Sequence, residues 1–153
     1  MENNSKSKYF VFIILILFAL FIFYSPKIFV EKPYRTITPE GYPTGTTVEL
    51  YTKIPPEFPK EVVLENKTLD YSGQLKTLEG KTKTTVSYIS GQYILDLINL
   101  YVEGLPKVGW TVDNKSITPE SSVLQVSKGE EKLIISITFI EDGRSMVTFQ
   151  YEK

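Results

Sequence analysis

The sequence predicts an α+β domain, an antiparallel sheet of about six strands covered by one helix, preceded by an N-terminal transmembrane helix. The predicted order within the domain is β-β-α-β-β-β-β. Three observations lead to this prediction. Apolar and polar residues alternate over several segments, which is typical of strands with one buried face. One segment between them has apolar residues at helical spacing. An uncharged apolar run near the N-terminus is long enough to span a bilayer.

Residues 9–24, YFVFIILILFALFIFY, form that apolar run. Extended to Val30 as a helix, the segment measures about 33 Å, slightly more than the hydrocarbon core of about 30 Å. A cleaved signal peptide has a shorter apolar region and small residues at its cleavage site, and this segment has neither. We therefore predict a cytoplasmic tail at 1–8, a signal-anchor in the lipid bilayer at 9–30, and a C-terminal domain outside the cytoplasmic membrane.

Residues 31–60 are rich in proline and contain six of the nine prolines in the chain. Such composition favours a semi-rigid spacer between the anchor and the domain. One part of it, TTVELYTKI, alternates Val48, Leu50 and Ile54 with polar residues. This alternation predicts a strand added to the edge of the domain.

Residues 61–153 are predicted to fold as the extracytoplasmic α+β domain. Glycine follows a polar residue in LEGK, SKGEEK and EDGR, each of which separates two alternating runs and so indicates a hairpin. In KLIISITFI, Leu133, Ile135 and Ile137 fall on one face, which needs a cover. The predicted strands are 67–78, 82–90, 110–117, 122–128, 132–140 and 145–152.

A single helix supplies the predicted cover. Ser90 is a suitable N-cap, and Pro106 ends the helix at or before Leu105. The apolar residues at helical spacing are Ile94, Leu97, Ile98, Tyr101 and Leu105. They place one apolar stripe against the sheet.

Two strings, EFPKEVVLENKTL at 57–69 and LYVEGLPKVGW at 100–110, resemble those of a loosely defined group of small bacterial and archaeal envelope domains. Members combine an FP…V start with a helix that ends in LPxxGW. The resemblance covers about residues 57–153 and implies a domain held outside the cytoplasmic membrane, without implying an activity. The chain departs from the lipoprotein members because it has no cysteine, and Val63 stands where a second proline is often found.

The composition argues against several functions. The net charge is −1, with 17 basic and 18 acidic residues, so we predict no nucleic-acid partner. Cysteine and histidine are both absent, which removes thiolate and imidazole chemistry and the usual zinc ligands. Asp96 and Glu103 lie about 10.5 Å apart along the helix, beyond the separation of glycosidase carboxylates. We therefore predict no enzyme, no catalytic residue, no metal site and no cofactor.

Four aromatic residues near the helix form the candidate surface for a ligand or a partner: Tyr88, Tyr93, Tyr101 and Trp110. Exposed tyrosines are enriched at interfaces, although β-propensity and packing explain tyrosines in strands equally well. Trp110 follows the helix end and begins a strand. Packing of the helix end onto the sheet is therefore the favoured interpretation of Trp110, and ligand contact is the alternative.

These observations predict a non-enzymatic protein-interaction or accessory module of the cell envelope, with an envelope or membrane protein as its partner. The alternative function is a glycan or small-ligand binding domain that uses the tyrosines near the helix. A flat or fully packed Tyr88–Tyr101 region, together with no thermal shift across a glycan panel, would remove that alternative, and a concave aromatic patch would favour it.

Overall fold

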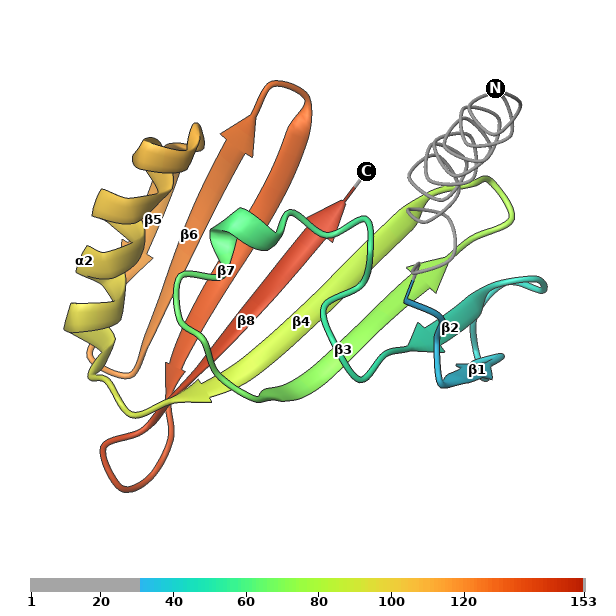
Figure 1. The fold of residues 1–153 in the computed structure, drawn as a ribbon, viewed down its shortest axis with the longest axis horizontal. Coiled ribbons are helices and arrows are strands. Elements are labelled where there is room, and N and C mark those ends of the chain that lie inside the picture. The colour runs from blue at the N-terminus through green and yellow to red at the C-terminus, as the bar shows by residue number, and fades with distance from the viewer. Residues whose placement is uncertain (1–30, 153) are drawn as a thin grey trace, which may run out of the picture. The chain divides into compact units, whose positions relative to one another are not determined.

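A computed structural model of the chain describes residues 31–152 (Figure 1). The elements all lie in one compact unit, Lys32–Lys153. The helices are the 3₁₀ turns η1 (Lys60–Val62) and η2 (Leu105–Val108) and the α-helix α2 (Ile94–Gly104). The strands are β1 (Arg35–Ile37), β2 (Thr47–Leu50), β3 (Leu69–Lys76), β4 (Thr82–Ser90), β5 (Thr111–Ile117), β6 (Ser121–Lys128), β7 (Glu131–Phe139) and β8 (Ser145–Glu152).

The eight described strands form one antiparallel sheet in the order β1-β2-β3-β4-β8-β7-β6-β5. The chain builds β1 to β4 side by side, crosses with α2 to the far edge, and returns strand by strand until β8 pairs with β4. The register aligns Val86, Phe149 and Ile135 across three central strands. These three residues are fully buried, so the register fixes the centre of the core.

Two segments cover the buried face of the sheet (Figure 1). Helix α2 lies against β6 and β7, and residues 51–68, which we call the covering loop, cross over β8 and β4. In that loop, the Phe58 ring packs edge-on against Phe149 and Tyr151, with centroid distances of 5.9 and 6.0 Å. The core is therefore covered by a loop as well as by the single predicted helix.

Helix α2 buries Ile94, Leu97, Ile98 and Tyr101, as its apolar spacing predicts. It starts later than the predicted N-cap at Ser90. The Ser90 hydroxyl accepts from the Gln92 N–H and donates to Glu65 of the covering loop, and Tyr93 occupies the N-cap position. The helix continues into η2, where Pro106 lies in the first turn. The chain then reverses at Gly109, whose φ of 86° is in the left-handed region that suits glycine.

The sheet is wider than predicted, with eight described strands in place of about six. The two additional strands, β1 and β2, come from residues 31–60, where a spacer with one edge strand in TTVELYTKI was predicted. Strand β2 lies within that segment, whereas β1 was not predicted. The prolines of residues 31–60 lie outside both strands, where no ladder hydrogen bond is lost. Val48 and Leu50, both in β2, pair with residues of β3. The fold is consequently mostly antiparallel sheet with one short α-helix of 11 residues.

The structure also contradicts the predicted transmembrane helix. The predicted signal-anchor and single-pass location in the cytoplasmic membrane depend on that helix and are corrected with it. Within residues 31–152 no helix is both long and apolar enough to cross a membrane. Helix α2 has 11 residues, which gives about 16 Å of helix against a hydrocarbon core of about 30 Å. The segment 9–30, on which that prediction was based, lies outside the described residues.

Candidate functional site

One face of the sheet carries the core, and we call the opposite face the open face. In residues 31–152, the helices and the covering loop lie on the core side (Figure 1). The middle of the open face is polar but uncharged, because Ser87, Thr148 and Ser136 stand opposite one another on neighbouring strands. An antiparallel sheet commonly presents such a face to water. A binding site on it therefore needs a more specific feature.

That feature is a groove of about 280 Å³ where β2 ends and β3 begins, and Tyr34, which precedes β1, also lines it. We call it the tyrosine groove. The side chains that define its chemistry are Tyr34, Leu50, Asp70 and Tyr71, and its remaining lining comes from Tyr51, Thr52, Leu69 and Ser72. The exposed fractions of Tyr34 and Tyr71 are 64% and 41%. The groove thus combines two exposed aromatic side chains, one aliphatic side chain and one carboxylate.

The position of Tyr71 depends on the absence of a side chain at Gly73, two residues further along β3. A Cβ atom at Gly73 would lie 2.7 Å from Cζ of Tyr71 and still closer to its hydroxyl oxygen. Tyr71 can therefore lie over β3 only because residue 73 has no side chain. Burial raises the pKa of Tyr71, and the charge of the nearby Tyr34 phenol raises it further. Tyr34 and Tyr71 line the same groove, so one ligand could contact both.

Tyr34 and Asp70 are positioned by the backbone. The Tyr34 N–H donates to the Leu50 carbonyl at 2.8 Å, which holds the start of β1 against β2. Asp70 lies at an irregularity in β3, because the pairing with β4 shifts between Leu69 and Tyr71. A bulge of this kind redirects a side chain. The exposed Asp70 carboxylate has neither a hydrogen bond nor an ion pair with any residue in 31–152.

The acidic residues of a second hollow on the open face already have partners. A hollow of about 360 Å³ is lined by Asp113, Lys132 and Glu152, among others. The Glu152 carboxylate pairs with Lys83 at 2.9 Å, and the Ser127 hydroxyl donates to Asp113 at 3.0 Å. The contrast with Asp70 makes the tyrosine groove the stronger candidate for a binding site.

The structure does not bring the four predicted site residues onto one surface. Tyr88, Tyr101 and Trp110 are buried in the core, whereas Tyr93 is 67% exposed. Tyr93 lies beside Gly143 of the β7–β8 turn. The tyrosines nearest the helix thus divide into a buried pair and one exposed ring, and none of them lines the tyrosine groove.

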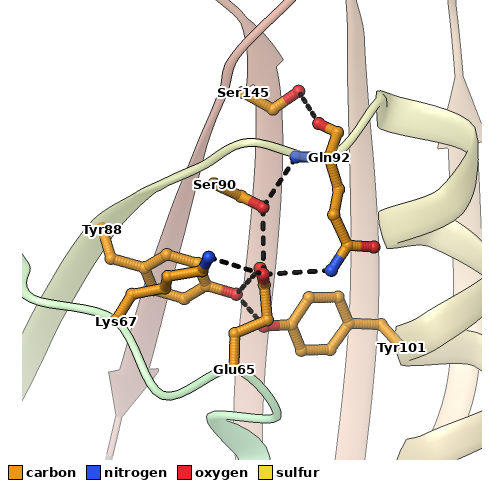
Figure 2. A network of polar contacts seen from close by, with 7 residues as sticks. All are labelled: Glu65, Lys67, Tyr88, Ser90, Gln92, Tyr101 and Ser145. Atoms are coloured by element: carbon orange, nitrogen blue, oxygen red, sulfur yellow. Dashed lines mark hydrogen bonds and ion pairs between the residues drawn. The ribbon is translucent and has the colours of Figure 1, made fainter.

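The buried pair belongs to a polar network around Glu65 (Figure 2). The Tyr88 hydroxyl donates to the Glu65 carboxylate at 2.8 Å and lies 2.6 Å from the Tyr101 hydroxyl. Ser90 and Gln92 also donate to Glu65, at 3.1 and 3.0 Å. Burial raises the pKa of Tyr88 and of Tyr101 far above that of a free phenol. The network joins the covering loop to β4 and α2, and these tyrosines remain neutral.

Trp110 is 1% exposed and belongs to the core, as the packing interpretation predicted. Its Nε1–H donates to Glu61 of the covering loop at 3.4 Å. Lys128 Nζ pairs with the same carboxylate at 3.1 Å and lies 5.9 Å from the tryptophan ring centroid. Trp110 therefore joins the helix end, the loop and β6.

No family model, no curated protein and no solved structure matches the chain. Among residues 31–152, no three acidic side chains are grouped closely enough to hold a metal ion. Sequence reasoning did not single out Tyr34, Asp70 or Tyr71. The one available signal was the glycine inside LDYSG, since a glycine within a strand often marks a bulge or a close approach.

Proposed function

We propose that this domain is a non-enzymatic protein-interaction module that binds a partner protein at the tyrosine groove. The observation that carries the proposal is the convergence of Tyr34, Tyr71 and Asp70 in one groove, where Asp70 has no partner among residues 31–152. Tyrosine is enriched at protein interfaces, because it offers a large contact area at a low cost in side-chain entropy. The carboxylate adds a directional polar contact.

The groove is built on a rigid support. The Tyr51 hydroxyl donates to Glu49 at 2.7 Å, and Lys76 pairs with the same carboxylate at 2.9 Å. The Ser72 hydroxyl donates to the Lys53 carbonyl at 2.7 Å, which ties the covering loop to β3. A pre-organised site loses little conformational entropy on binding, so more of the contact energy appears as affinity.

Glycan binding is the alternative, and the exposed tyrosines could stack on a sugar ring. Sugar recognition also requires several polar groups that converge on the ring hydroxyls. The Ser72 hydroxyl already donates to Lys53, which leaves mainly Asp70 and the two phenols for that role. The balance of aromatic and polar groups therefore favours a protein partner.

Site-specific photo-cross-linking tests the proposal. A photoreactive phenylalanine analogue replaces Tyr34 in the full-length chain, in the native cells, and the same analogue at the exposed Tyr93 is the matched control. We expect a discrete protein adduct from position 34 that disappears when Tyr71→Ala is added. The proposal fails if position 34 gives no adduct, or if both positions give the same adducts.

A further inference from the structure

We propose that the partner presents a lysine or arginine side chain to the tyrosine groove, which extends the proposed function and rests on it. The cationic group would pair with the Asp70 carboxylate and lie against the faces of Tyr34 and Tyr71. Its aliphatic stem would pack along Leu50. Each of these contacts uses a side chain that lines the same groove.

The charge of the groove supports a cation. Glu49 pairs with Lys76 and Glu65 with Lys67, whereas Asp70 forms no ion pair within residues 31–152. Arg35, the cationic residue next to Tyr34, stands opposite Leu50 on β2 and therefore lies on the same face as Leu50, but it forms no ion pair with Asp70 within residues 31–152. The carboxylate is thus not neutralised by the described part of the chain, and an incoming cation completes the ion pair.

The aromatic side chains support the same ligand. The face of a tyrosine ring is negative, so it attracts an ammonium or guanidinium group within about 6 Å of its centroid. Lysine and arginine also carry long aliphatic stems that pack on apolar surface while the charged end reaches a polar group. Leu50, at the end of β2, provides that surface and lines the groove together with both tyrosines.

The size of the groove limits what it can hold. Pockets for drug-sized ligands usually measure about 300–1,000 Å³, and this groove measures about 280 Å³. It suits one side chain of an exposed segment better than a folded surface or an oligosaccharide. A protein partner would therefore dock around the groove and insert a single residue.

An NMR titration of the full-length chain, labelled with ¹³C at the tyrosine rings, tests this inference. The probe is N-acetyl-lysine methylamide, and its uncharged counterpart is N-acetyl-norleucine methylamide. Tyr34→Phe and Tyr71→Phe assign the two groove resonances. We expect saturable shifts of both resonances with the lysine probe, unchanged Tyr93, and at least tenfold weaker response to norleucine, as the loss of a charge-assisted contact predicts.

Asp70→Asn should weaken the lysine response about tenfold, while the matched change Asp96→Asn at an exposed helix position should leave it unaltered. Unchanged amide spectra establish that both variants fold. Methyl glucoside is titrated in the same way as a sugar probe. Equal responses to the lysine and norleucine probes, no saturable shift at all, or a response only to methyl glucoside would each overturn the inference. A cross-link from position 34 without a cation preference would remove this inference and leave the proposed function standing.

Discussion

The hydroxyl oxygens of Tyr88 on β4 and Tyr101 on α2 lie 2.6 Å apart, and the Tyr88 hydroxyl also donates to Glu65. This contact joins the sheet, the helix and the covering loop at one buried point (Figure 2). Tyr88 and Tyr101, which were predicted for a ligand or partner surface, therefore belong to the core. The contact also yields two predictions about stability.

Glu65→Ala should lower the free energy of unfolding by about 3 kcal/mol, because it leaves several buried donors without an acceptor. Those donors belong to Tyr88, Ser90 and Gln92. Urea unfolding of the variant and of Glu57→Ala, an exposed position in the same loop, measures the difference. Equal midpoints for the two variants would show that the network does not hold the loop.

Alkaline pH should destabilise the fold. Burial raises the pKa of Tyr88 and Tyr101 and raises that of Tyr151 to about 12. These tyrosines remain protonated in the folded state when those of the unfolded chain ionise, so stability is fully present below about pH 10 and falls above it. The slope is about 1.4 kcal/mol per pH unit for each tyrosine.

Urea unfolding from about pH 8 to about pH 12 checks this slope, because that range extends from below the usual tyrosine pKa to above it. Tyr151→Phe should reduce the alkaline loss, whereas Tyr93→Phe, at an exposed ring, should leave it unchanged. A stability that stays constant to pH 12 would contradict the buried, neutral state of these phenols.

Trp110→Ala should destabilise the domain by about 4 kcal/mol, at the usual scale for removal of a buried large aromatic side chain. The substitution also removes the donor to Glu61. Trp110→Phe keeps most of the ring volume and should lose less. Thermal melts of both variants measure the effect, and an unchanged melting temperature for Trp110→Ala would be incompatible with its burial.

Gly73→Ala should displace Tyr71 and weaken partner binding, because the added methyl group collides with the phenol. In the Tyr71→Ala background the same change should have little further effect, since the collision is gone. Gly91→Ala is the control, because nothing lies within 4 Å of its Cβ position. The ring resonance of Tyr71 reports the displacement, and an unshifted resonance would mean that Gly73 does not set the groove.

Local patterns predicted much of the fold. The strands predicted within residues 61–153 correspond to β3 to β8, with 82–90 and 145–152 placed at the observed bounds. Their alternation is long and their turns contain Gly80, Gly129 and Gly143, all at positive φ. Strand β1 has only three residues, too few for an alternation, and it depends on its pairing with β2.

The groove could not be predicted in the same way. Tyr34 is distant in sequence from Asp70 and Tyr71, and only the pairing of β1, β2 and β3 brings them together. The sequence drew attention instead to aromatic residues next to the helix. Burial of Tyr88, Tyr101 and Trp110 depends on the covering loop, whose path no periodic pattern indicates.

The most direct test of the groove as a binding site is the dissociation constant of the cross-linked partner for the full-length chain and three variants. If the tyrosine groove binds the partner, Tyr34→Ala and Tyr71→Ala should each raise the Kd at least about tenfold, as central aromatic residues of an interface do. Tyr93→Ala should change it by less than about twofold, as expected of a residue outside the interface. A Kd that is the same for all three variants, or that rises only with Tyr93→Ala, would contradict the assignment of the binding site to this groove.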